Sequence, residues 1–242
     1  HFYLVFVDMK KKIAILGSTG SIGKTLINII KKDKDKIKIL LLTTNKNYKE
    51  LLIQVKIFNV KNIIVTDHKF FLITKNLLKN KKINVYNSFD EINHIFKRKI
   101  IDYTMNAISG LSGLRPTLEI IKFSKNIAIA NKESIICGWC LIEKKLKKYK
   151  TEFIPVDSEH FSIWSLIGKF QKNDIESVII TASGGPFKDL PLNKFKSITV
   201  DDALKHPNWI MGKKISVDSA TMMNKVFEII EAKKIFNLDY NK

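Results

Sequence analysis

The stretch Lys12-Ile-Ala-Ile-Leu-Gly17-Ser-Thr-Gly20-Ser-Ile-Gly23 decides the fold class of this chain. Its apolar first half predicts a buried strand over residues 12–16, and the apolar positions between residues 22 and 30 have helical spacing. Between them lies a GxxGxxG loop, in the strand–loop–helix order that dinucleotide-binding loops require. The glycines permit a tight turn, and the helix start offers unpaired N–H groups to a pyrophosphate. A structural turn without a ligand is the alternative interpretation.

The same alternation of strand and helix continues along the chain. Further strands are predicted at 37–42, 62–66, 83–86, 100–105 and 126–130, and helices near 48–58, 69–79, 89–97, 115–124 and 133–147. The strands are continuous apolar runs, which is typical of parallel strands covered on both faces. We therefore predict an α/β fold, a Rossmann-like doubly wound parallel sheet that forms an NADP-binding domain over residues 9–150.

A smaller α/β catalytic domain is predicted for residues 151–242. The pattern predicts a strand at 153–156, a helix at 160–169 and a strand at 178–182. A long irregular segment follows at 183–213. Loops of this length in compact domains are usually functional or disordered, and we interpret this one as a flap.

The end of the second predicted strand distinguishes between nicotinamide cofactors. A carboxylate at this point usually binds the ribose 2′-hydroxyl of NAD. Here the sequence is Leu42-Thr-Thr-Asn45-Lys46-Asn47, which has no carboxylate and has a lysine that can meet a 2′-phosphate. Lysine is frequent throughout the chain, so the missing acid is the stronger evidence. It favours NADP.

Two acidic residues follow the strand predicted at 153–156. Asp157 and Glu159 share one face of an extended chain, so both carboxylates can reach one point. Carboxylate oxygens are hard ligands that suit Mg²⁺ or Mn²⁺. A solvated acidic turn is the alternative interpretation.

A second polar cluster lies further along, in the sequence SVDSATMMNKVFE at 216–228. Ser219 is a candidate N-cap for the helix that follows. Asn224, Lys225 and Glu228 lie on one face of that helix. We expect Ser219, Asn224 and Lys225 to bind a phosphate, and Glu228 to add a third carboxylate to the metal site.

Three further features each have two interpretations. Glu231 is either an outer residue of the metal site or a solvated helix charge. The sequence SGGPF at 183–187 is either a phosphate-contacting turn or a simple turn. His206 and Trp209 lie in the flap, where an indole can cover a substrate or pack into a small core beneath the loop.

Composition excludes several classes of function. The formal net charge of +19 invites a nucleic-acid interpretation, but Arg98 and Arg115 are the only arginines among 42 basic residues. Base-edge recognition favours arginine, so a solvated lysine surface is favoured. No run approaches the roughly 18 consecutive apolar residues of a membrane span. A soluble protein without membrane or nucleic-acid partners is expected.

Cys137 and Cys140 form the sequence C-G-W-C inside an apolar helical run. A redox pair is one interpretation. Packing as two small apolar residues is favoured, because no strand leads into the motif. The absence of a disulfide framework favours a reducing, cytoplasmic compartment. An organelle stroma is the alternative if an upstream targeting segment is missing.

Several motifs together resemble one enzyme family. They are GSTGSIG at 17–23, ANKES at 130–134, PVDSEH at 155–160, SGGPF at 183–187, HPNWIMGKKISVDSATMMNK at 206–225 and EIIEA at 228–232. In order and spacing they are similar to the 1-deoxy-D-xylulose 5-phosphate reductoisomerases, from about residue 11 to residue 242. The resemblance implies NADPH-dependent, divalent-metal-dependent isomerisation and reduction of this sugar phosphate to 2-C-methyl-D-erythritol 4-phosphate, in non-mevalonate isoprenoid biosynthesis.

The resemblance also implies a role for each matching residue. The implied metal ligands are Asp157, Glu159 and Glu228, and the implied catalytic residues are these three together with Lys132. The implied substrate-binding residues are Ser158, Ser183, His206, Trp209, Ser219, Asn224 and Lys225. The expected NADPH-binding residues are Gly17, Thr19, Gly20, Ser21, Ile22, Gly23, Asn45, Lys46, Asn47, Asn131 and Glu133.

The chain departs from the family pattern in three ways. Val226 stands where the family usually has a small residue, and Asn45 stands where glycine is common. The family also continues into further strands and a C-terminal helical domain, so we expect this chain to be truncated and the full-length protein to be a homodimer.

A non-catalytic NADP-binding protein is the alternative function. A semialdehyde-type dehydrogenase would need a catalytic cysteine, and Cys137 and Cys140 lie in the wrong context.

Overall fold

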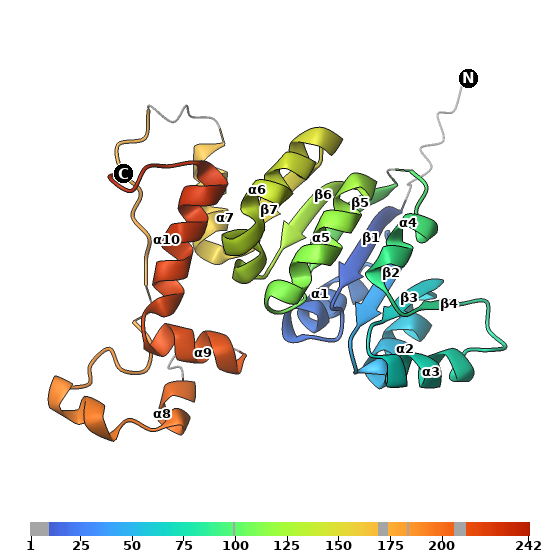
Figure 1. The fold of residues 1–242 in the computed structure, drawn as a ribbon, viewed down its shortest axis with the longest axis horizontal. Coiled ribbons are helices and arrows are strands. Elements are labelled where there is room, and N and C mark those ends of the chain that lie inside the picture. The colour runs from blue at the N-terminus through green and yellow to red at the C-terminus, as the bar shows by residue number, and fades with distance from the viewer. Residues whose placement is uncertain (1–9, 99, 169–173, 183, 206–211) are drawn as a thin grey trace. The chain divides into compact units, whose positions relative to one another are not determined.

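The computed structural model describes residues 10–98, 100–168, 174–182, 184–205 and 212–242. The chain forms two compact units, one ending at Val156 and the other beginning at Asp157. Figure 1 shows the elements in chain order. The part of the chain described contains no helix that is long and apolar enough to span a membrane.

The first unit is built around one parallel sheet of seven strands, in the order β4-β3-β2-β1-β5-β6-β7. The order reverses at β1, which makes the sheet doubly wound and confirms the predicted fold class. Every strand expected in this part of the chain is present. The bounds are β1 Lys11–Leu16, β2 Ile37–Thr44, β3 Asn62–Val65, β4 Asn84–Tyr86, β5 Ile101–Asn106, β6 Ser124–Ile129 and β7 Glu152–Pro155.

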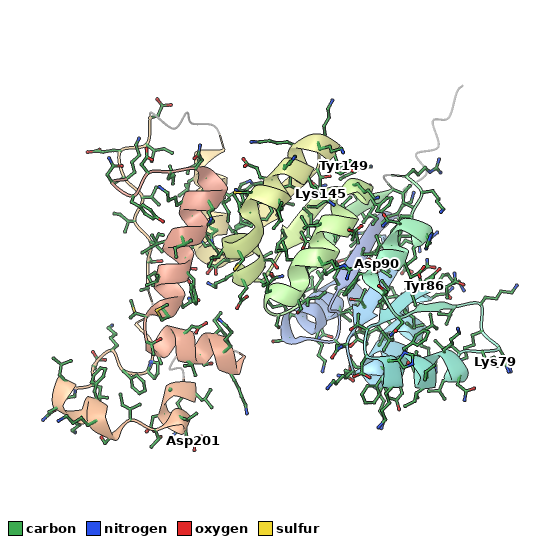
Figure 2. The ribbon with its side chains drawn as sticks, in the orientation of Figure 1. Lys79, Tyr86, Asp90, Lys145, Tyr149 and Asp201 are labelled. Atoms are coloured by element: carbon green, nitrogen blue, oxygen red, sulfur yellow. The ribbon has the colours of Figure 1, made fainter. Side chains whose placement is uncertain are left out.

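Helices cover both faces of this sheet, because right-handed crossovers that run in opposite directions from its centre pass over opposite faces. Figure 1 shows α5 and α6 in front of the sheet. Lys145 on α6 donates to the carbonyl oxygen of Leu118 on α5 at 2.8 Å, which joins these two helices (Figure 2). The bounds are α1 Ser21–Lys31, α2 Tyr48–Phe58, α3 His68–Leu77, α4 Ile92–Ile95, α5 Leu114–Ile120 and α6 Lys132–Tyr149.

Local sequence explains where several of these helices begin. The side chains of Asn47, Asp67 and Asn131 each accept a hydrogen bond from the backbone N–H three residues on, at the starts of α2, α3 and α6. Such caps satisfy backbone donors that have no partner within the helix. They fix the helix starts at the carboxyl ends of β2, β3 and β6.

The core lies where the central strands meet their covering helices. Ile15, Leu42 and Ile63 on adjacent strands are fully buried, with Ile27 of α1 and Val55 of α2 packed into the same cluster. Burial of a side chain of this size stabilises the fold by roughly 1.5–3 kcal/mol. The core therefore holds β1 and its glycine loop in place.

The prediction that Cys137 and Cys140 pack as small apolar residues is wrong. Cys137 and Cys140 are both exposed free thiols, because α6 packs through its opposite face. The buried positions on that face include Ile135, Trp139 and Ile142, which follow one another at helical spacing.

The second unit is helical over much of its described length. Its elements are α7 Ser158–Ile167, the 3-10 helix η5 Leu192–Ser197, α8 Val200–Leu204, α9 Lys213–Ala220 and α10 Met223–Phe236. Two of them, η5 and α8, lie inside the segment predicted to be an irregular flap. A capping box between Thr199 and Asp202 starts α8.

Two expectations for the second unit are wrong. Residues 178–182 do not form a strand, because no described strand runs beside them and a strand needs a neighbour for its backbone groups. Ile179 is accordingly 86% exposed. Ser219 is not an N-cap, because it lies inside α9 and α10 begins only after Met222, whose φ is +61°.

Candidate active site

The glycine loop after β1 is held by the end of β2. The N–H of Gly17 donates to the Thr43 hydroxyl at 2.8 Å, and the N–H of Ser18 donates to the Thr43 carbonyl at 2.9 Å. The hydroxyls of Thr19 and Thr44 are 2.6 Å apart. The buried Gln54 amide donates to the Ser18 carbonyl at 3.1 Å. These contacts fix the loop before any ligand arrives.

Two glycines of this loop have no room for a side chain. Gly17 has a φ of +75°, and a Cβ on it would lie 2.9 Å from the backbone of Ala107 after β5. A Cβ on Gly23 would lie 2.3 Å from the Gly17 carbonyl oxygen. Helix α1 therefore packs directly against the loop, and its first turn has no acidic residue and no side-chain cap. The positive end of the helix is thus suited to an anion.

The predicted cofactor residues lie at the carboxyl edge of the same sheet. Asn45, Lys46 and Asn47 follow β2 and are exposed, whereas Thr44 is buried. Asn45 donates to the Thr66 hydroxyl at 2.8 Å, and Asn47 also caps α2. These three positions carry no carboxylate, which favours NADP over NAD.

The residues after β6 lie at the same edge, because parallel strands share one carboxyl end. Asn131 is buried and caps α6 by accepting the N–H of Ser134 at 3.1 Å. Lys132 and Glu133 follow in the first turn and are half-buried. β6 neighbours β5, which neighbours β1, so these residues follow the same edge of the sheet as the glycine loop.

In the second unit, three carboxylates converge. One oxygen from each of Asp157, Glu159 and Glu228 lies within 4.8 Å of the others. Asp157 precedes α7, Glu159 lies in the first turn of α7, and Glu228 lies on α10 with 2% exposure. The first two meet because α7 begins between them, and not because they share a strand face. The set of hard oxygen donors fits Mg²⁺ or Mn²⁺.

Lys225 lies among these carboxylates. Its ammonium donates to Glu159 Oε1 at 3.1 Å, to Glu228 Oε2 and to the Thr181 carbonyl oxygen. Asn224 donates to the other oxygen of Glu228. Polar groups of the N-terminal halves of α7 and α10, with the Thr181 carbonyl, therefore form one connected network.

This network controls the charges of its members. Burial raises the pKa of Glu159, but hydrogen bonds, led by that from the Ser158 hydroxyl, outweigh burial and hold the pKa at about 2. Burial lowers the pKa of Lys225, but its hydrogen bonds with Glu228 and Glu159 raise the pKa above its ordinary value. Both groups are therefore charged at neutral pH.

A buried histidine lies behind the carboxylates, and the sequence analysis gave it no role. His160 is 1% exposed, and its Nε2 contacts the Glu228 carbonyl oxygen at 2.8 Å. Its Nδ1 lies 3.7 Å from Asp157 Oδ1 and 3.9 Å from Glu231 Oε2. Glu231 is only 2% exposed, so its interpretation as a solvated charge is wrong. The spacing of Glu228 and Glu231, one helical turn apart, was the signal that could have predicted that both acids lie on the same buried face of the helix.

The remaining predicted site residues are only partly described. Ser219 lies at the end of α9, where a Cβ on Gly185 would come within 2.7 Å of the Ser219 carbonyl oxygen. The backbone at Gly185 therefore packs against the end of α9. Ser183, His206 and Trp209 lie outside the described residues.

Family models and curated relatives point to one enzyme family. The family model for 1-deoxy-D-xylulose 5-phosphate reductoisomerase matches residues 13–138, and the model for the C-terminal domain of that enzyme matches residues 153–236. The reductoisomerase of Pelagibacter ubique is 69% identical over 233 residues, which are 96% of this chain. This chain spans only 60% of the length of that relative.

Solved structures agree with the sequence comparison. The reductoisomerase of Zymomonas mobilis in complex with NADPH has a TM-score of 0.85 and 34% identity, over 96% of this chain and 59% of that one. A reductoisomerase in complex with NADPH, fosmidomycin and magnesium has a TM-score of 0.82 and 32% identity, over 95% of this chain and 59% of that one.

Proposed function

We propose that the full-length protein is an NADP-dependent 1-deoxy-D-xylulose 5-phosphate reductoisomerase, because this chain belongs to that enzyme family. The proposed reaction is the isomerisation and reduction of 1-deoxy-D-xylulose 5-phosphate to 2-C-methyl-D-erythritol 4-phosphate, with NADPH as reductant and Mg²⁺ or Mn²⁺ as metal. The observation that carries this proposal is the convergence of Asp157, Glu159 and Glu228 beside Lys225.

The first unit is proposed to bind NADPH. Its glycine loop and the uncapped start of α1 suit a pyrophosphate, and the end of β2 suits a 2′-phosphate. The reductoisomerase of Zymomonas mobilis, which is similar over 96% of this chain, holds NADPH. We accordingly keep the NADP-binding domain at residues 9–150 and the catalytic domain at 151–242 as a proposal.

The second unit is proposed to bind the metal and the sugar phosphate. A divalent cation held by the three carboxylates supplies Lewis-acid stabilisation of negative charge on substrate oxygens. Asn224 and Lys225 at the start of α10 are proposed to hold the phosphate with Ser219, and Ser158 and Lys132 to contact the reacting atoms. The roles of Ser183, His206 and Trp209 stay predictions from the family resemblance, as does the homodimer.

One assay tests this proposal. NADPH consumption by the full-length protein is followed with the sugar phosphate and Mg²⁺ or Mn²⁺ each supplied or withheld. We expect consumption only when substrate and metal are both present. Glu228→Gln should abolish it, whereas Glu176→Gln, an exposed control in the same unit, should not. A folded protein that binds NADPH but never consumes it would favour the non-catalytic alternative.

A further inference from the structure

We propose that Lys225 couples the metal site to the phosphate site, because its ammonium and a divalent cation compete for the same two carboxylates, Glu159 and Glu228. The inference rests on the proposed function and adds an order of binding to it. In this arrangement a cation that binds to the carboxylates releases Lys225 to contact an anion.

The first argument is the number of hydrogen bonds that Lys225 makes. A lysine ammonium has three donors and no acceptor. In this structure it contacts three acceptors, namely Glu159 Oε1, Glu228 Oε2 and the carbonyl oxygen of Thr181. A phosphate can therefore receive a hydrogen bond from Lys225 only if at least one of these contacts is given up.

The second argument is the identity of two of those acceptors. Glu159 and Glu228 belong to the cluster that is proposed to hold the metal, together with Asp157. A divalent cation bound there would lie within a few ångströms of the Lys225 ammonium. The side chain of Lys225 is 16% exposed and that of Glu228 is 2% exposed. Water screens the repulsion between the two cations poorly at such a site.

The third argument is where Lys225 can go. It lies in the first turn of the 14-residue helix α10, beside Asn224 and after the end of α9, which carries Ser219. Unpaired N–H groups and the helix dipole favour an anion at such a helix start. A long, flexible lysine side chain can turn from the carboxylates toward an anion bound there without a change of fold.

The consequence is a reciprocal coupling. Without the cation, an anion must break ion pairs to recruit Lys225, and with the cation the ammonium is already free. The cation should therefore strengthen phosphate binding, and phosphate should strengthen cation binding by the same factor. The metal would thus prepare the phosphate site as well as the reacting end of the substrate.

The test measures two ligands directly and does not depend on turnover. Inorganic phosphate is titrated into the full-length protein with and without saturating Mg²⁺ in a calorimeter, and Mg²⁺ is titrated with and without phosphate. For the unmodified protein we expect Mg²⁺ to raise the affinity for phosphate by at least about fivefold, the lower end of typical coupling. In Lys225→Met the enhancement should fall below twofold, and Mg²⁺ alone should bind more tightly than in the unmodified protein.

Controls separate this coupling from general electrostatics. Lys234→Met removes the same charge from the last turn of the same helix, whereas Lys225 lies in the first, and should leave the enhancement unchanged. An equal enhancement in the unmodified protein and in Lys225→Met would overturn the inference but leave the proposed function intact. Failure of Mg²⁺ to bind either protein would overturn the proposed metal site as well. If Lys225→Met does not fold, the absence of enhancement in the unmodified protein still overturns the inference.

Discussion

The Nε2–H of His160 donates to the main-chain carbonyl oxygen of Glu228 at 2.8 Å. A carbonyl oxygen only accepts, so this bond places the proton on Nε2. It joins α7, which carries Glu159, to α10, which carries Glu228. The Nδ1 edge of the same ring faces the carboxylates of Asp157 and Glu231. The positions of the carboxylates proposed to hold the metal therefore depend on how these two helices pack.

Replacing His160 should loosen the metal site and destabilise the second unit. His160→Leu removes the donor and leaves buried carboxylates against an apolar side chain, which costs roughly 1–3 kcal/mol. His160→Gln can keep an N–H near the Glu228 carbonyl and should recover part of this loss. Thermal unfolding and Mn²⁺ titration measure both effects. The exposed Ser162 on the same helix provides the control, Ser162→Ala, and an equal loss in that variant would contradict the prediction.

Two buried acids on α10 should behave differently. Glu228→Gln removes a ligand of the three-carboxylate cluster and should weaken Mg²⁺ or Mn²⁺ binding by on the order of 100-fold, about 2.7 kcal/mol. Glu231 is equally buried but belongs to the group with His160, so Glu231→Gln should weaken metal binding by only about tenfold, the lower end for a residue behind the ligands. Calorimetric metal titration of both folded variants makes the comparison. A greater loss of affinity in Glu231→Gln would indicate that the metal binds to the group formed by Asp157, His160 and Glu231.

A carboxylate placed after β2 should change the cofactor preference. Asn45→Asp puts a negative charge where a 2′-phosphate is expected and offers an acceptor to a ribose hydroxyl. We expect the ratio of NADPH to NADH affinity to fall by at least about tenfold, which corresponds to about 1.4 kcal/mol. Fluorescence titration with both cofactors measures the ratio. Asp67 lies beyond β3 in the same part of the sheet, and Asp67→Asn should leave the ratio unchanged.

The glycine loop should tolerate a methyl group at one position and not at another. A Cβ on Gly23 would lie 2.3 Å from the Gly17 carbonyl oxygen, so Gly23→Ala must push α1 away from the loop. Overpacking of this kind costs about 1–3 kcal/mol. A Cβ on Gly20 meets nothing closer than 3.5 Å, so Gly20→Ala should unfold near the unmodified temperature. Similar unfolding temperatures for the two variants would refute the close packing of α1.

Asp102 should make the first unit more stable at neutral pH than in acid. It accepts hydrogen bonds from the N–H of Lys12 at 2.8 Å and from the Lys125 ammonium at 2.7 Å. Burial raises the pKa of Asp102, but these two bonds, with that from Lys125 the larger, hold the pKa below its ordinary value of 3.8.

The sign of the pH dependence follows from that shift. A carboxyl whose pKa is lower in the folded chain stabilises the fold above its unfolded pKa, and the effect is lost as the pH falls toward the folded pKa. Asp102→Asn should therefore lower stability by about 1 kcal/mol at pH 7. Unfolding curves of the two proteins should converge as the pH falls below 3.8. A difference that stays constant with pH would show that packing alone is responsible.

The sheet could be predicted from sequence because its strands are buried on both faces. Ile15, Leu42 and Ile63 lie in short continuous apolar runs, and such runs are typical of strands buried on both faces. The strand predicted at 178–182 failed for the opposite reason. Its composition suits a strand, but pairing depends on a neighbour that the local sequence does not specify.

The site was predicted in its residue types but not in its geometry. The acids at 157, 159 and 228 carried a signal in their spacing and in the family motifs. Their meeting point depends on α7 beginning at Ser158 and on the backbone reversal at Met222, a residue type that rarely adopts a positive φ. The ion pair between Lys225 and Glu159 joins residues more than sixty positions apart, which no local pattern reveals.

The reversal of strand order at β1 affects how freely this sequence can evolve. The connections that leave β1 and β5 pass to opposite faces of the sheet, so the path of the chain itself separates the loops that follow these two strands. A pyrophosphate bound there would contact mainly the backbone of the loop after β1. Side chains on the outer surfaces, where the lysines give a net charge of +19, can therefore change without altering that backbone.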